Sequence, residues 1–205
     1  MKKRTNNFHT VEAKASSYAW VQRADELYVA ARFLYWKGFP FAFALLGAHV
    51  MELYLKAYLI HKVGKYPKSH DLGRIYEECL KHDNFFDEES LRRHFLPLKP
   101  PLPGTQATWT HYLEVLRYPE SLPNVPRPAG AGLITGYGGT CQTLDCVAHF
   151  VKQAVPRLKG ERDIIDDIIN GDGYIWAIHA PDGGQEIREL FLHDNNYFTV
   201  KDRKL

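Results

Sequence analysis

The feature that most restricts the fold of this chain is a long apolar stretch with helix-ending residues on both sides. It runs from Pro40 to Val63, with Gly38 shortly before it and Gly64 directly after it. Proline is tolerated in the first turn of a helix, and glycine is favoured just past the last turn. The sequence therefore predicts one helix over residues 40–63, the most apolar helix of the protein.

This stretch does not predict a membrane span. Its most apolar window, Phe39–Ala48, is short and runs into His49, Glu52 and Lys56, so it is too charged to cross a bilayer. No apolar segment follows the basic N-terminus in the manner of a signal peptide. The three cysteines form no CxxC pair, which is typical of a reduced protein. We expect no membrane association and a cytoplasmic location.

Apolar residues recur at helical spacing in other parts of the chain as well. A helix that starts at Ser16 should pair with the apolar helix as an antiparallel hairpin, because the connection at Gly38 is short. Ser69 is a candidate N-cap for a third helix and Asp87 for a short one. The sequence predicts an all-α, up-and-down bundle of four to five helices, the later ones over residues 70–82, 87–95, 105–117 and 140–158.

The C-terminal region has a different pattern. Residues 161–169 predict a short helix, and the segments 174–180 and 186–192 flank a Pro-Asp-Gly-Gly turn typical of a β-hairpin. Residues 197–200 would form a third short strand. We expect three parts: a flexible arm over 1–15, the helical bundle over 16–159, and a short helix with a small C-terminal β-hairpin over 160–205.

Several motifs occur in an order that resembles the HEPN family (higher eukaryotes and prokaryotes nucleotide-binding domain). The resemblance covers roughly residues 16–158 and rests on the following residues: Ala42 and Ala44, Glu52 with Lys56-Ala57, His70-Asp71-Leu72, Leu116-Arg117-Tyr118-Pro119, and Asp145 to Val151. It implies a HEPN-like bundle that forms a homodimer around its late helices. It also implies a protein that binds RNA or a nucleotide, as part of a prokaryotic toxin–antitoxin or anti-phage defence system.

The catalytic pair of HEPN ribonucleases is absent from its usual place. These enzymes carry Arg-x(4–6)-His on a late helix, where histidine transfers protons and the cation stabilises the developing charge. The pairs Arg4–His9 and Arg188–His193 match the spacing but lie outside the bundle, and no histidine follows Arg117 at that distance. One alternative is a metal-independent endoribonuclease that uses Arg117 with His111 or His149.

Six residues are candidates for lining a ligand-binding cleft: His49, Glu52, Lys56, His70, Arg117 and Tyr118. Glu52 and Lys56 are four residues apart, which also suits a purely structural ion pair on one helix face. His70 and Asp71 also suit a simple helix cap. Lys62, Lys65 and Lys68 alternate with tyrosines in a stretch between residues 53 and 70 that contains no acidic residue. These lysines also suit either a binding role or a structural one. That composition suits phosphates and stacked bases, or a solvated helix end.

Neither a metal nor a cofactor is predicted. His49-x-x-Glu52 and Asp145-x-x-x-His149 place possible ligands on helix faces, but di-iron bundles need several glutamates and two Glu-x-x-His pairs. The net charge of only +2 argues against a broadly basic nucleic-acid-binding surface and leaves room for a local patch. A last alternative is a non-catalytic dimeric scaffold that binds a protein partner through residues 161–205.

Overall fold

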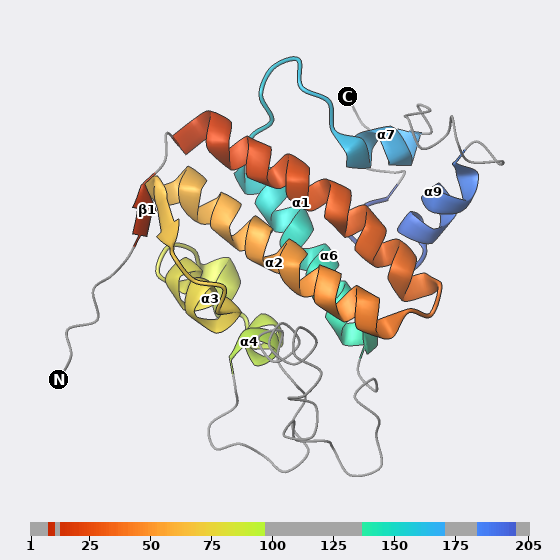
Figure 1. Ribbon diagram of the computed structural model, residues 1–205, viewed down its shortest axis with the longest axis horizontal. Helices are drawn as coiled ribbons and strands as arrows, with labels where there is room; N and C mark the ends of the chain where they lie inside the picture. The colour runs from red at the N-terminus through yellow and green to blue at the C-terminus, as the bar shows by residue number, and fades with distance from the viewer. Residues whose placement is uncertain (1–7, 11–12, 97–136, 171–183, 200–205) are drawn as a thin grey trace, which may run out of the picture.

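The structure, a computed structural model, describes residues 8–10, 13–96, 137–170 and 184–199. Two long helices, α1 (Ala13–Trp36) and α2 (Pro40–Val63), form the expected antiparallel hairpin, and α6 (Tyr137–Ala154) packs against both (Figure 1). The short helices α3 (Leu72–Leu80) and α4 (Glu89–Phe95) cover α2 and α6 on one side. The fold is therefore an all-α bundle, as the sequence predicts.

Helix α2 is the centre of the bundle and has the predicted bounds. Pro40 opens it, and Gly64 ends it in the left-handed conformation with φ of 69°, while its N–H donates to the Ile60 carbonyl at 2.9 Å. The helix is long and apolar enough to cross a membrane, but 83% of its most apolar window is buried inside the protein. That burial is what the core helix of a bundle requires.

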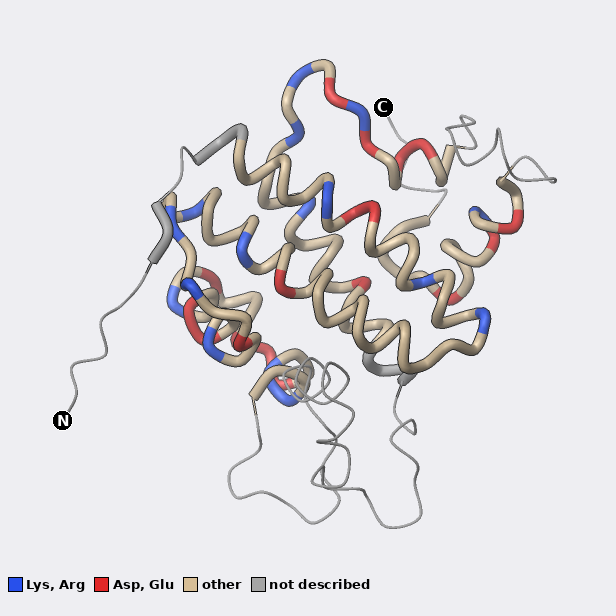
Figure 2. The backbone as a smooth tube through the Cα atoms, viewed as in Figure 1, with Lys and Arg blue, Asp and Glu red and all other residues tan. Residues whose placement is uncertain are grey.

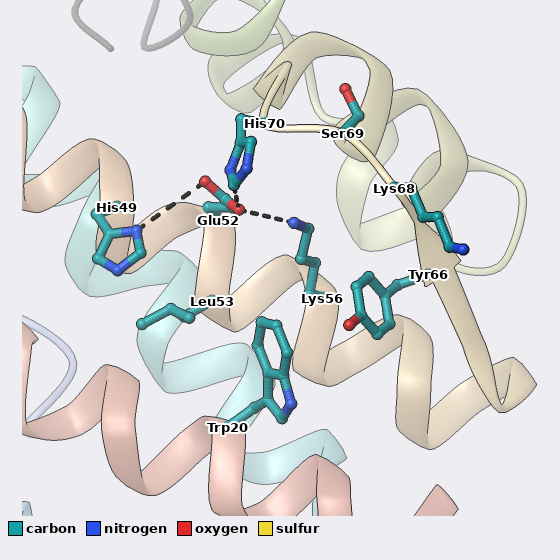
Figure 3. Close-up of a pocket in the computed structure, with 9 residues that line it drawn as sticks. All are labelled: Trp20, His49, Glu52, Leu53, Lys56, Tyr66, Lys68, Ser69 and His70. Atoms are coloured by element: carbon teal, nitrogen blue, oxygen red, sulfur yellow. Dashed lines mark hydrogen bonds and ion pairs between the residues drawn. The ribbon is translucent and has the colours of Figure 1, made fainter. Parts of the chain in front are cut away.

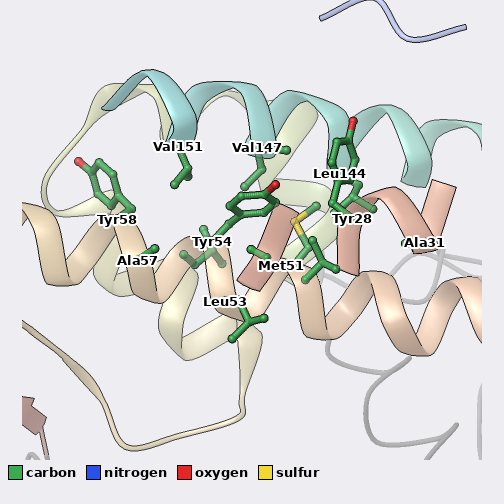
Figure 4. Close-up of a cluster of buried hydrophobic side chains, with 14 of the residues drawn as sticks. Tyr28, Ala31, Met51, Leu53, Tyr54, Ala57, Tyr58, Leu144, Val147 and Val151 are labelled. Atoms are coloured by element: carbon green, nitrogen blue, oxygen red, sulfur yellow. The ribbon is translucent and has the colours of Figure 1, made fainter. Parts of the chain in front are cut away.

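The core is formed where α1, α2 and α6 face one another (Figure 4). Tyr28 of α1 meets Tyr54 of α2 edge to face, with ring centroids 6.3 Å apart. Leu144, Val147 and Val151 of α6 recur every three to four residues and are fully buried against this pair. The spacing that predicted the last bundle helix is therefore the spacing of its buried face, although α6 begins at Tyr137 and ends at Ala154 rather than spanning 140–158.

The segment after α2 differs in detail from its prediction. Asp71, rather than Ser69, caps α3: its carboxylate accepts the Arg74 N–H at 3.2 Å, so the helix starts at Leu72. The short helix expected over 87–95 is present as α4 over Glu89–Phe95, and Asp87 is the last residue of a 3-10 turn over Asn84–Asp87 that precedes it. The predicted helix over 105–117 lies outside the described residues.

Within the segment 1–15, where a flexible arm was expected, the described residues 8–10 take part in the fold. Residues Phe8–Thr10 form strand β1, which pairs antiparallel with β2 (Lys65–Pro67) just after α2. His9 lies opposite Tyr66 in this pairing. Helix α1 also begins at Ala13, three residues before its predicted start at Ser16. The strand pairing holds β2 in place beside the bundle.

The predicted strand over 186–192 is wrong. This segment is helix α9 (Gln185–Leu192), which follows α7 (Ile164–Asn170) in the described chain. Phe191 is buried and Ile187, four residues before it, packs against the core, which is helical spacing. Residues 197–199 are not a strand either, and the segment 174–180 lies outside the described residues.

A buried polar cluster ties the C-terminal segment to the bundle. Arg32, 1% exposed, forms an ion pair with Asp145 of α6 and donates to the His193 carbonyl at 2.5 Å. The Tyr28 hydroxyl donates to the same carboxylate at 2.6 Å and accepts from the Asn195 amide at 3.2 Å. Both oxygens of the Asp145 carboxylate accept hydrogen bonds within this cluster, so Asp145 contributes to the fold here.

Candidate functional site

A pocket of about 420 Å³ opens beside α2, where α1, β2 and the turn into α3 meet (Figure 3). It is made by elements from three parts of the chain, brought together by the helix hairpin and the β1–β2 pairing. The residues that line it are Trp20, His49, Glu52, Leu53, Lys56, Tyr66, Lys68, Ser69 and His70.

The floor of the pocket carries a buried ion pair. Lys56 Nζ donates to Glu52 Oε1 at 2.7 Å, and the two side chains are 5% and 3% exposed. The pair sits one helical turn apart on the most apolar helix, so the sequence spacing alone brings the charges together. A buried ion pair costs desolvation and is often no better for stability than apolar residues of the same size. Here the pair lies next to the open space of the pocket.

Two histidines flank the same carboxylate. His70 Nδ1 lies 2.9 Å from Glu52 Oε1, and His49 Nδ1 lies 4.0 Å from Glu52 Oε2 (Figure 3). Oε2 is buried and has no hydrogen-bond donor within the part of the chain that the structure describes. His70 is held in this position by the turn that leads from β2 to the Asp71 cap of α3.

Aromatic rings form another wall of the pocket. Trp20 of α1 and Tyr66 of β2 have ring centroids 5.2 Å apart, and Lys56 Nζ lies 5.3 Å from the Tyr66 ring centroid. The ammonium group thus contacts both an anion and an aromatic face, which are its two favourable neighbours. The rings offer a flat apolar surface of the kind on which bases stack.

Exposed polar groups lie at the edge of the pocket. Lys68 is exposed, and the His70 side chain is 71% exposed even though its Nδ1 faces Glu52. Cations beside an aromatic wall suit a ligand that has both a ring and an anionic group, such as a nucleotide. No group of three or more metal-ligating side chains occurs among the described residues.

The pocket contains part of the predicted site. It brings together His49, Glu52, Lys56 and His70. The other candidates, Arg117, Tyr118 and His111, lie outside the described residues. His149 does not line the pocket: it belongs to α6, and its ring centroid is 5.7 Å from that of Tyr197 and 5.5 Å from that of Phe198.

Sequence reasoning missed Trp20 and Leu53 as lining residues. Leu53 follows Glu52 in an apolar helix, and nothing local separates it from the core. Trp20 lies 29 residues before His49, the next lining residue in the sequence, and reaches the site through the α1–α2 packing. Tyr66 and Lys68 had a signal, because they belong to the acid-free stretch of lysines and tyrosines.

The comparisons with known proteins agree with the helical architecture. The sequence model of the HEPN domain matches residues 17–123, which is more than half of the chain. The match includes α1 from residue 17 on, all of α2, β2 and α3, and every residue of the pocket. No curated protein and no solved structure matches the chain significantly. The chain belongs to the HEPN family.

Proposed function

We propose that this protein binds RNA or a nucleotide in the pocket between α1, α2, β2 and α3. Some members of the HEPN family bind nucleotides or RNA or have ribonuclease-like functions. The observation that carries the proposal is the composition of the pocket: the Trp20 and Tyr66 rings, the buried Lys56, and the exposed Lys68 at the edge. A base would stack on the rings, and its phosphate would lie near the lysines.

The family also supports a cellular role. We propose that the protein is a cytoplasmic homodimer in a prokaryotic toxin–antitoxin or anti-phage system. The alternative of a scaffold that adds a strand to a partner through residues 161–205 loses its basis at 186–192, because that segment is a helix. The ribonuclease alternative that uses Arg117 with His111 or His149 stays a prediction.

The binding proposal is tested with a fluorescently labelled single-stranded RNA, with nucleoside monophosphates as unlabelled competitors. Tyr66→Leu keeps an apolar side chain but removes the ring, and it should weaken binding about 10-fold, because stacking of a base on a ring contributes about 1–3 kcal/mol. Lys68→Gln should weaken it as well, since it removes a cation from the pocket edge. Fluorescence anisotropy measures both effects.

Two matched variants serve as controls. Phe41→Leu removes an aromatic ring that is 48% exposed on α2, outside the pocket, and Lys159→Gln neutralises an exposed lysine elsewhere. Both should bind RNA like the unaltered protein. If Tyr66→Leu and Lys68→Gln also bind like the unaltered protein, or if no RNA and no nucleotide binds at all, the pocket is not the binding site.

A further inference from the structure

Two histidines from different elements face one buried carboxylate of the pocket (Figure 3). His70 Nδ1, in the turn before α3, lies 2.9 Å from Glu52 Oε1, and His49 Nδ1, on α2, lies 4.0 Å from Glu52 Oε2. The His49 and His70 side chains are 42% and 71% exposed, whereas that of Glu52 is 3% exposed. Protons from the solvent therefore reach both imidazole rings, and each ring, once protonated, is at ion-pair distance from the same carboxylate.

Two lysines supply the other positive charges of the pocket. Lys56 Nζ lies 2.7 Å from Glu52 Oε1, so these two charges compensate each other, and Lys68 is exposed at the edge. With both histidines neutral, the two lysines and the one glutamate give the lining a formal charge of +1, and protonation of both histidines raises it to +3. The charge that faces a bound phosphate thus depends on pH in the range where histidine ordinarily titrates, about pH 5 to pH 8.

The other elements around the pocket do not reproduce this change. Helix α1 contributes Trp20 and β2 contributes Tyr66, and neither an indole nor a neutral phenol takes up a proton in this range. Asp71 follows His70 in the chain, and its carboxylate accepts the Arg74 N–H at 3.2 Å at the start of α3. The two histidines are therefore the groups of the described lining that add positive charge to it as the pH falls.

We infer that His49 and His70 make binding in this pocket pH-dependent, so that single-stranded RNA binds more tightly as the pH falls from about 8 to about 5.5; the inference rests on the proposed function. A phosphate attracts a protonated imidazole more strongly than a neutral one, so binding and protonation favour each other. Binding therefore takes up protons, and the affinity falls as the pH rises and the histidines lose their protons. Glu52, between the two rings, holds them at the pocket as their ion-pair partner.

Isothermal titration calorimetry of the full chain with a short oligouridylate, which carries hydroxyl groups at both ends, tests this pH dependence. Uracil and phosphodiester groups keep their charge over this pH range, so a change in affinity reflects the protein. At constant ionic strength the affinity should be about 10-fold higher at about pH 5.5 than at about pH 8, which is a usual size for coupling between two binding events. Titrations in two buffers that differ in their enthalpy of ionisation should show that protons are taken up on binding at about pH 6.5.

The pocket variant is His49→Asn/His70→Asn, in which each side-chain amide can take the place of the imidazole Nδ1 but cannot gain a charge. It should bind within about threefold of the unaltered protein at about pH 8, where histidines are mostly neutral, and it should lose both the tighter binding at low pH and the proton uptake. The matched control is His82→Asn/His193→Asn. These two histidines also face carboxylates, at 3.8 Å and 3.3 Å, but do not line the pocket. The control should keep the full pH dependence.

Circular dichroism at both pH values checks the fold of the variants, and the proton uptake of the unaltered protein needs no variant at all. Equal affinity at both pH values without proton uptake overturns the inference and leaves the proposed function standing. A pH dependence that persists in the pocket variant, or that disappears in the control, also overturns the inference, because the titrating groups then lie elsewhere. An absence of RNA binding at every pH overturns both.

Discussion

Asp25 is a buried carboxylate on the side of α1 that faces α2 and α6. It is 2% exposed, and it accepts hydrogen bonds from the Tyr54 hydroxyl at 2.5 Å and from Lys152 Nζ at 2.6 Å. Lys152 also donates to Asp163 at 2.5 Å, so one ammonium group serves two carboxylates. Burial raises the pKa of Asp25 to about 6, and the neighbouring Lys152 only partly opposes this.

This shift predicts a pH dependence of stability. A carboxyl whose pKa is higher in the folded than in the unfolded state binds more protons when folded, so it stabilises the fold at low pH. The stabilisation is complete below pH 4, near the unfolded pKa, and is lost as the pH rises through about 6. Asp25→Asn removes this titration. The stability of the unaltered protein relative to Asp25→Asn should therefore fall by about 2–3 kcal/mol between pH 4 and pH 7.

Urea unfolding of both proteins at several pH values measures this difference. Using the difference cancels the titration of all other groups, because they are common to the two proteins. In the variant, the Tyr54 hydroxyl can still donate to the amide oxygen, and Lys152 keeps its bond to Asp163. The variant should therefore fold. A difference that stays constant or grows with pH would mean that Lys152 keeps Asp25 charged throughout.

At the scale of elements, helix α9 depends on one anchoring side chain. Phe191 is 1% exposed, and its ring centroid lies 5.5 Å from that of Tyr28 in an edge-to-face contact. The Arg32 guanidinium lies 5.7 Å from the same ring. Phe191 therefore joins the C-terminal helix to α1 and to the buried polar cluster around Arg32.

Removal of this anchor should destabilise the protein. Phe191→Ala leaves a cavity between α9 and α1, and substitutions of this kind typically cost about 3–5 kcal/mol. Glu189→Ala, on the exposed side of α9, should change the free energy of unfolding by less than about 0.5 kcal/mol. Urea unfolding followed by circular dichroism gives both values. A cost of less than about 1 kcal/mol for Phe191→Ala would mean that α9 contributes little to the folded bundle.

The elements also show what the sequence can and cannot predict. Helix α2 has its predicted bounds because proline and glycine act locally at its two ends. The strand prediction at 186–192 fails because Ile187 and Phe191, four residues apart, lie on one face of either a strand or a helix, and the packing of Phe191 on Tyr28 selects the helix. In the pocket, the spacing along α2 identifies Glu52 and Lys56, whereas Trp20 reaches the site only through packing between helices.

At the scale of the whole molecule, charge is distributed unevenly. The net charge is only +2, yet residues 53–70 contain no aspartate or glutamate. In Figure 2 the end of α2 and the β2 segment carry basic residues, and acidic residues lie on α3 and near α7. Long-range attraction of a polyanion by the whole protein should therefore be weak, and the basic stretch beside the pocket should supply the attraction.

The salt dependence of RNA binding tests this local origin. Each phosphate of a single strand that a cation neutralises contributes about −0.7 to the slope of log K against log salt concentration. Contacts by Lys62, Lys65 and Lys68 would give a slope of roughly −2. The double variant Lys62→Gln/Lys68→Gln should reduce its magnitude by roughly 1.4, whereas Lys159→Gln should leave it unchanged. Anisotropy titrations at four salt concentrations give the slopes. A slope near zero, or one that the double variant does not change, would show that the phosphates lie away from this basic stretch. The ligand would then be held by the aromatic rings and the buried ion pair of the pocket.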